Sequence, residues 1–107
     1  MDKSFIKERY ARIRLAHNIS ARRLSMELGQ SSEYINQIET GKSMPSVEGL
    51  INFCDYFGMS ASEFFDDRIA FPVEYKAIAD ELNKMDAMEI GLVLDLLKLI
   101  NSKRENR

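Results

Sequence analysis

The sequence predicts an all-α fold. Apolar residues recur at helical spacings of three and four along most of the 107 residues, and no stretch of any length alternates apolar and polar side chains as a strand would. Serine or aspartate stands before most of these stretches, and glycine or asparagine follows several of them. These residues favour the beginnings and ends of helices. We therefore expect a chain of short helices and no sheet.

The first expected helix spans residues 5–17 and is ended by Asn18, which tolerates left-handed backbone angles. Four of its residues share one side at helical spacing and are expected to be buried: Ile6, Tyr10, Ile13 and His17. The single histidine of the chain is thus predicted to be a packed core residue rather than a catalytic base.

Residues 20–45 predict two short helices joined by a tight turn. Ser20 is suited to cap the first of them, because its hydroxyl can accept a bond from a free backbone N–H. Leu24 and Leu28 form the apolar side of this helix. Gly29 ends it, since glycine adopts left-handed backbone angles without a Cβ penalty.

The second helix of the pair is expected over residues 32–40. Ser31 is expected to cap it, Gly41 to end it, and Pro45 cannot continue it. Its apolar side carries Ile35 and Ile38. Because only about three residues connect the two helices, they must cross steeply, so the leading residues of the second helix project into solvent.

A fourth helix is expected after Ser46 and before Gly58. Its apolar stripe is formed by Val47, Leu50, Ile51, Cys54 and Phe57. Ser60 and Glu63 then have the spacing of a capping box, in which each side chain bonds the backbone of the other residue. They predict a short fifth helix over residues 61–65.

Residues 66–72 contain two aspartates before a proline and form the expected linker. The sixth helix beyond it has one apolar face, which carries Tyr75, Ile78, Ala79, Leu82 and Met85. Asp86 and Glu89 resemble a second capping box, which begins a seventh helix over about residues 87–101. The chain is thereby divided into an N-terminal domain at residues 1–67, a C-terminal helical dimerisation hairpin at 72–102 and a disordered tail at 103–107.

The seventh helix has two apolar faces. One carries Ile90, Val93, Leu94, Leu97 and Ile100, and the other, on nearly the opposite side, carries Met88, Leu92, Leu96 and Leu99. A lone surface helix needs only one such stripe. We expect the chain's own helices to cover one face and a second copy of the chain to cover the other, because C2 dimers are the commonest oligomers. Burial of the helix inside the monomer is the alternative, and the pattern leaves open which face forms the dimer.

Composition limits the classes of function. The net charge is −2, with basic residues crowded into the first quarter and none in residues 48–67, where either a solvated face or a binding face is possible. A single cysteine, Cys54, excludes an internal disulfide, and one histidine cannot form a Cys/His metal cluster. We expect no metal, no cofactor and no enzymatic activity. Neither a secretory signal nor a bilayer-length apolar run is evident, so a cytoplasmic protein without membrane partners is expected.

The segment from Ile6 to about Phe65 resembles the Cro/C1-type helix-turn-helix family, also called the xenobiotic-response-element family of regulators. The ordered set of residues carries the resemblance, namely Ile6-Lys7-Glu8-Arg9, Ile13-Arg14, Ile19-Ser20, Leu24, Leu28-Gly29, Ser31, Ile35, Ile38-Glu39, Gly41-Lys42, Pro45-Ser46, Leu50, Phe57-Gly58-Met59-Ser60 and Glu63-Phe64-Phe65. Such a resemblance implies a five-helix lambda-repressor-like domain that binds double-stranded DNA and regulates transcription as a dimer. The C-terminal hairpin lies outside it.

The resemblance places base-contacting residues at the start of the third helix, at Ser32, Glu33 and Gln37, with Asn36 nearby. An amide such as Gln37 or Asn36 can grip adenine at N6 and N7, and a carboxylate such as Glu33 can accept a bond from cytosine N4. Glu33 fits equally well as a favourable charge in the first turn of a helix.

The resemblance also implies phosphate contacts, at Ser20, Arg22, Arg23, Thr40, Lys42 and Ser43. Tyr34 is expected either to contact the DNA backbone or to pack. Arg22 and Arg23 oppose the dipole at the start of their helix, which indicates a nearby anion, with a solvated pair as the alternative. A structural ion pair between Arg14 and Glu39 is implied as part of the scaffold.

The chain departs from the family pattern in three places. Ala21 stands where the family often has glutamine, and Ser25 stands where a small residue, usually alanine, lies within the second helix. No Lys or Arg occurs between Leu24 and Gly41. We therefore expect modest DNA affinity with a shallow salt dependence.

Two hypotheses of function follow. The first is a sequence-specific regulator, a repressor, that acts as a homodimer on a palindromic operator with its third helix in the major groove. The alternative is a protein-interaction module, such as an antitoxin, that keeps the scaffold and has weak or no DNA binding.

Overall fold

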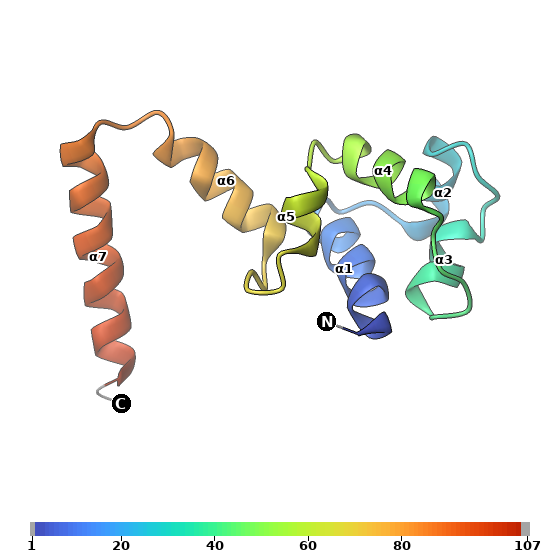
Figure 1. The fold of residues 1–107 in the computed structure, drawn as a ribbon, viewed down its shortest axis with the longest axis horizontal. Helices are drawn as coiled ribbons and strands as arrows, with labels where there is room; N and C mark the ends of the chain where they lie inside the picture. The colour runs from blue at the N-terminus through green and yellow to red at the C-terminus, as the bar shows by residue number, and fades with distance from the viewer. Residues whose placement is uncertain (1, 106–107) are drawn as a thin grey trace. The chain divides into compact units, whose positions relative to one another are not determined.

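The computed structural model describes residues 2–105, and every regular element in this range is a helix (Figure 1). The predicted all-α class is therefore confirmed. The chain forms two compact units, which divide between Val73 and Glu74. No helix in the described range is both long enough and apolar enough to cross a bilayer.

Five helices build the first unit: α1 (Lys3–Ala16), α2 (Ala21–Glu27), α3 (Tyr34–Glu39), α4 (Val47–Tyr56) and α5 (Ala61–Phe65). Three begin at the serines that the sequence predicts. The Ser20, Ser46 and Ser60 hydroxyls accept bonds from backbone N–H groups at 3.1, 3.0 and 3.1 Å, respectively. Glu63 completes the capping box of α5 by accepting a bond from the Ser60 N–H at 3.0 Å.

The predicted ends of the first three helices are also confirmed. Asn18 follows α1 with φ +56°, Gly29 follows α2 with φ +74°, and Gly41 follows α3 with φ +81°. All three angles lie in the left-handed region, which only glycine and, less readily, asparagine adopt without strain.

An aromatic cluster forms the centre of the first unit. Tyr10 of α1 stacks on Phe53 of α4 with ring centroids 3.9 Å apart, and Phe64 of α5 meets both rings edge-on. The remaining buried apolar residues surround this cluster: Ile13, Leu24, Ile35, Ile38, Cys54 and Met59. One core therefore joins all five helices and holds α3 against α1 and α2.

The structure corrects the expected start of the third helix. The helix begins at Tyr34 rather than at Ser32. Its N-cap residue is Glu33, whose side chain forms no capping hydrogen bond, so the predicted cap at Ser31 is wrong. The Ser31 backbone carbonyl instead accepts a bond from the Tyr34 N–H at 3.1 Å, which folds residues 31–34 into a turn. The connection from α2 to α3 is consequently longer than expected.

Two expected buried stripes are partly wrong. Val47 and Ile51 of α4 are 77% and 50% exposed, whereas Phe53 lies in the core, so the inward side of α4 is rotated from the one expected. His17 is exposed rather than packed in the core. Its Nδ1 lies 2.9 Å from the Ile13 carbonyl oxygen, and its ring lies beside Phe57 on the surface.

The expected linker is fastened to α1. The guanidinium of Arg9 donates to the carbonyl oxygens of Ile69 and Asp66 at 2.7 and 2.9 Å, and Arg12 donates to that of Ala70. Three charge-assisted bonds therefore hold residues 66–70 in place. The first unit continues to Val73, beyond the boundary at residue 67 that the sequence suggests.

The second unit contains most of α6 (Pro72–Leu82) and all of α7 (Ala87–Glu105). The predicted capping box is confirmed, because the Glu89 N–H donates to Asp86 at 2.9 Å and the Asp86 N–H donates to Glu89 at 3.1 Å. The last helix runs to Glu105, past its expected end near residue 101, so the first part of the expected disordered tail is helical. Residues 106–107 of that tail lie outside the described residues.

Both apolar faces of α7 are exposed in the single chain. Leu92, Leu96 and Leu99 on one face are 65, 56 and 53% exposed, and Leu94 and Leu97 on the other are both 48% exposed. The expectation that the chain's own helices cover one face, and the alternative of burial inside the monomer, stay predictions; within the second unit both faces are exposed. The short helix α6 does not supply the missing cover, since its own Tyr75 and Ile78 are 56 and 58% exposed.

Candidate nucleic-acid interface

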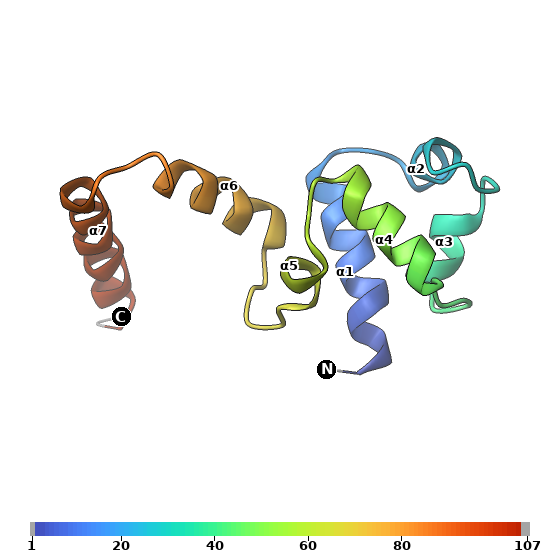
Figure 2. The ribbon, with the colours of Figure 1, turned by 45° about the horizontal axis from the view of Figure 1, so that its top comes forward.

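The α2–turn–α3 segment presents one side of α3 to solvent. Figure 2 shows α2 and α3 running in different directions, joined by the turn that follows Gly29. Ile35 and Ile38 face inward with 0 and 1% exposure, while Asn36 and Gln37 between them are exposed. The core thus fixes which side of α3 remains available to a ligand.

Ser25 anchors the beginning of α3 from the neighbouring helix. Its hydroxyl is fully buried, donates to the Ala21 carbonyl at 2.7 Å and accepts a bond from the Ile35 N–H at 3.0 Å. The Ile35 N–H belongs to the first turn of α3, where backbone N–H groups have no acceptor within the helix. The N-cap side chain of α3 does not supply an acceptor. Ser25 therefore supplies the cap that we had expected from Ser31.

The four candidate base-contacting residues fall in two places. Ser32 and Glu33 lie in the turn before α3, where Ser32 is half-buried and Glu33 exposed. Asn36 and Gln37 lie on α3 itself and are exposed. All four are on or immediately before one short helix, and the two amides have the donor and acceptor pair that adenine recognition requires.

The loop after α3 carries the next group of candidates. The backbone N–H groups of Lys42 and Ser43 both donate to the Gln37 carbonyl, at 2.9 and 3.1 Å, so only their side chains remain for a phosphate. The Thr40 hydroxyl donates to the Asn36 carbonyl at 2.8 Å. Lys42 is exposed, and Ser43 is half-buried.

Lys7 of α1 also reaches this loop. Its Cδ and Nζ lie 3.7 and 4.0 Å from the point where a Cβ on Gly41 would stand. A second cation, in addition to Lys42, therefore lies beside the C-terminal end of α3. The sequence placed Lys7 only within a generally basic first quarter, because nothing in a linear pattern indicates that α1 passes this loop.

At the other end of the segment, the two arginines of α2 differ. Arg22 is exposed and forms no ion pair within the described part of the chain, whereas Arg23 pairs with Glu27 at 3.2 Å. The Tyr56 hydroxyl of α4 also donates to Glu27. The hydrogen bond from Tyr56, and to a smaller extent the one from Arg23, holds the pKa of Glu27 below its usual value. Arg23 therefore already has one anion beside it, the Glu27 carboxylate four residues away, while its side chain remains exposed.

Arg14 and Glu39 form a bidentate pair between α1 and α3. The Arg14 Nε and Nη2 atoms donate to the two Glu39 oxygens at 2.7 and 2.9 Å, and the side chains are only 15 and 11% exposed. Arg14 also donates to the Ile19 carbonyl at 2.9 Å. Glu39 raises the pKa of Arg14, and the pair ties the C-terminal turn of α3 to the scaffold.

These pairs change the charge that α2 and α3 present. Three glutamates, Glu27, Glu33 and Glu39, stand in a stretch without a Lys or Arg of its own. Two of them are neutralised by Arg23 and Arg14, which lie outside that stretch in sequence but beside it in space. Glu33 alone among the three has no ion-pair partner among the described residues.

Tyr34 packs on the scaffold beside this surface. Its ring is half-buried against the core, and its hydroxyl lies over Gly49, where an added Cβ would stand 2.6 Å from the oxygen. Burial raises the pKa of the Tyr34 hydroxyl. Packing is thus one of its roles, and contact with a DNA backbone stays a prediction.

Comparison with known proteins identifies the same segment. A model of the Cro/C1-type helix-turn-helix family matches residues 11–64, which cover α2, α3, α4 and nearly all of α5. No curated protein and no solved structure gives a significant match. Within the described residues, no group of three or more His, Cys, Asp or Glu side chains is arranged to hold a metal ion.

Proposed function

Since this chain belongs to the Cro/C1-type helix-turn-helix family, and is thereby a DNA-binding regulator, we propose that it represses transcription as a homodimer. Each copy inserts α3 into one major groove of a palindromic operator, with half-sites about one helical turn, or 34–36 Å, apart. Asn36 and Gln37 contact base edges, and Ser32 and Glu33 contact the bases next to them.

The observation that carries this proposal is the pairing of two glutamates in the recognition segment. An α3 flanked by three free carboxylates would be repelled by a polyanion. With Glu27 held by Arg23 and Glu39 held by Arg14, the exposed side of α3 presents two amides and one carboxylate. Such a surface is compatible with a major groove, where a single glutamate can accept a bond from cytosine N4.

Phosphate contacts support the docking at both ends of α3. Lys42 and Lys7 lie beside the loop that follows the helix, and Arg22 lies in the first turn of α2 next to the Ser20 cap. Ser43, Thr40, Tyr34 and Arg23 complete the predicted contacts. Few cations are involved, so the logarithm of the binding constant should fall with the logarithm of salt concentration by only about 0.9 per phosphate neutralised.

The proposed dimer contact lies on α7, at Met88, Leu92, Leu96 and Leu99. Their exposure in the single chain leaves a large apolar surface in contact with water, which is unfavourable by about 25 cal/mol per Å². A second copy of the same helix removes this surface from water and supplies the two-fold symmetry that a palindromic operator requires.

Substitution of Gln37 and Lys42 separates base recognition from phosphate contact. On a DNA site selected by the full chain, Gln37→Ala should lose about 1–3 kcal/mol of discrimination at one base pair. Lys42→Ala should weaken binding to all sequences alike and reduce the salt slope by about 1. Lys84→Ala, which removes an exposed cation from the second unit, serves as the control and should change neither quantity. Unchanged specificity in Gln37→Ala would contradict the assignment of α3 to the major groove.

A protein-interaction module is the second candidate function, and the doubly apolar α7 favours it. In this case α7 binds a different protein and the first unit serves only as a scaffold. This alternative predicts that no DNA shows a mobility shift at low salt. It also predicts that Gln37→Ala and Lys42→Ala leave binding to the protein partner unchanged.

A further inference from the structure

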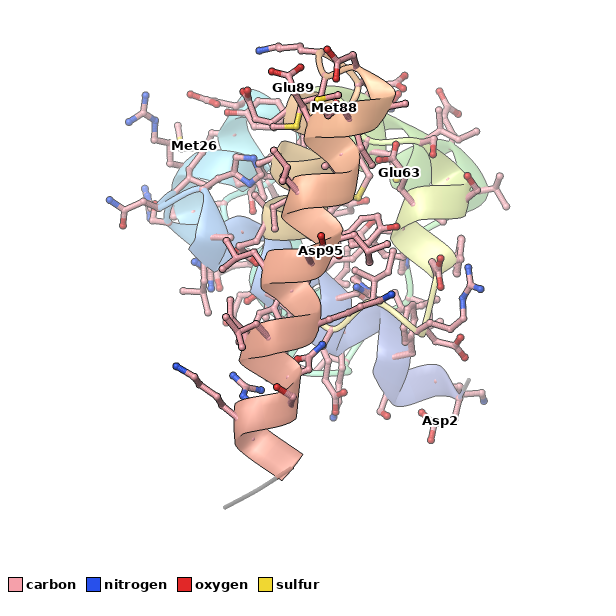
Figure 3. The ribbon with its side chains drawn as sticks, turned by 90° about the vertical axis from the view of Figure 1, so that its left-hand side faces the viewer. Asp2, Met26, Glu63, Met88, Glu89 and Asp95 are labelled. Atoms are coloured by element: carbon pink, nitrogen blue, oxygen red, sulfur yellow. The ribbon has the colours of Figure 1, made fainter. Side chains whose placement is uncertain are left out.

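Charges are distributed unequally along α7. Its first turn carries Glu89, and its last turn carries Lys103 and Arg104. Figure 3 looks onto this helix, with Met88 and Glu89 at the end where it begins and Asp95 midway along it. The helix is therefore acidic where it starts and basic where it ends.

Two of these charges lie on the apolar side of the helix. At about 100° per residue, Glu89 and Lys103 stand close to the direction of Leu96, one about two turns before it and the other about two turns after it. Leu92 and Leu99 flank Leu96 on the same side, and all three leucines are more than half exposed. The result is an exposed leucine stripe with an acid at one end and a base at the other.

We propose that two copies of the chain pair through this stripe in antiparallel orientation, around a two-fold axis near Leu96. Glu89 of each copy then pairs with the partner subunit's Lys103, so two ion pairs close the ends of the apolar contact. This inference rests on the proposed homodimer and specifies its geometry. A parallel pair would instead place glutamate opposite glutamate and lysine opposite lysine, which is destabilising.

The capping box prepares Glu89 for this role. Its Oε1 already accepts a bond from the Asp86 N–H at 3.1 Å, which holds the carboxylate at a fixed position in the first turn. A side chain that is held in place loses less conformational entropy when it forms an ion pair. Lys103 is exposed on the last turn.

The antiparallel arrangement separates the starts of the two α7 helices. The two points at which the chain enters α7, at Ala87, lie at opposite ends of the helix pair, about 27 Å apart along its axis at 1.5 Å per residue. In a parallel pair they would be neighbours, about 8–10 Å apart.

The helix dipole offers another reason for the same charge distribution, because acids favour the start of a helix and bases its end. Charge reversal distinguishes the two explanations. In an antiparallel pair Lys103→Glu alone, or Glu89→Lys alone, places like charges opposite one another, and each should raise the dimer dissociation constant at least tenfold. The double reversal, Glu89→Lys with Lys103→Glu, should restore the dimer to within a few-fold of the original. Glu89→Gln, which can keep the capping box without the charge, should have a smaller effect than Glu89→Lys.

Sedimentation equilibrium of the full chain measures these constants. Rescue by the double reversal supports the proposal. Single variants that dimerise as well as the original chain would overturn it in favour of parallel pairing, and a double variant weaker than either single one would overturn it in favour of the dipole explanation. If the unaltered chain is monomeric at high concentration, the proposed homodimer itself fails, which is a separate result from a dimer that ignores these substitutions.

A distance measurement gives an independent test. A spin label at Ala87→Cys, with the buried Cys54 changed to Ala, reports the separation of the two α7 starts in the dimer. A separation near the axial value of about 27 Å or longer supports antiparallel pairing. A separation near the interaxial distance of about 10 Å would overturn it.

Discussion

Ser25 shows how one buried hydroxyl supports the beginning of α3. The Ser25 hydroxyl accepts a hydrogen bond from the Ile35 N–H and donates one to the Ala21 carbonyl, so it joins α2 to α3. An alanine side chain at this position could make neither bond. The turn before α3 can therefore omit a serine cap of its own.

Ser25→Ala should lower the free energy of unfolding by about 1–3 kcal/mol, because it leaves the buried Ile35 N–H without an acceptor. Denaturant unfolding of the full chain measures the change. Ser31→Ala is the matched control, since the Ser31 side chain does not cap α3, and it should cost less than about 0.5 kcal/mol. A larger loss in Ser31→Ala than in Ser25→Ala would contradict this assignment of the cap.

Tyr10 presents the opposite case, a buried hydroxyl without a partner. Its side chain is fully buried, its oxygen has no hydrogen bond within the described structure, and burial raises its pKa. Tyr10→Phe removes this unsatisfied group and keeps the stacked ring, so the melting temperature should stay the same or rise. A decrease of more than about 1 kcal/mol in the free energy of unfolding would show that the Tyr10 hydroxyl has a hydrogen-bond partner in solution.

At the scale of elements, the Arg14–Glu39 pair links α1 to the last turn of α3. Breaking a pair this well buried leaves one charge without compensation. Glu39→Ala should therefore lose about 3–5 kcal/mol of stability in thermal or denaturant unfolding. The double variant Arg14→Met with Glu39→Leu should recover much of the loss, because it leaves no unpaired charge. Wild-type stability in Glu39→Ala alone would contradict the scaffold role of the pair.

Helix boundaries were predictable where the signal is local. Ser20, Ser46 and Ser60 cap the helices that the sequence assigns to them, and Gly29 and Gly41 end theirs, because capping bonds and left-handed angles involve only neighbouring residues. Buried faces were less predictable. Val47 and Ile51 share helical spacing with Cys54 but are exposed, and Phe53 is buried in their place. The buried face of this short helix is determined by the aromatic rings it packs against, such as Tyr10.

The candidate site was predictable to the same extent. The exposure of Asn36 and Gln37 follows from the inward positions of Ile35 and Ile38 along α3, and Glu33 is exposed in the turn before the helix. The neighbours that adjust the site come from distant parts of the chain: Lys7 from α1, and Tyr56, which holds Glu27, from α4. No linear spacing indicates such contacts.

At the scale of the whole molecule, DNA binding and dimerisation are expected to be coupled through α7. Leu96→Glu places a charge in the middle of the proposed contact and should convert the dimer to a monomer. Affinity for a two-half-site operator should then fall at least a hundredfold, because each copy binds one half-site alone. Asp95→Lys changes the charge of the neighbouring residue, which lies about 100° around the helix from Leu96, and as the control it should have little effect. Equal operator affinity in Leu96→Glu would show that recognition does not depend on the dimer.

Selection of bound sequences from a random DNA pool, with the full chain at low salt, tests the central claim most directly. The account predicts enrichment of a palindrome whose half-sites lie about one helical turn apart, and loss of preference at one position of each half-site with Gln37→Ala. A pool that shows no enrichment would contradict it, and α3 would then not be a DNA-recognition helix.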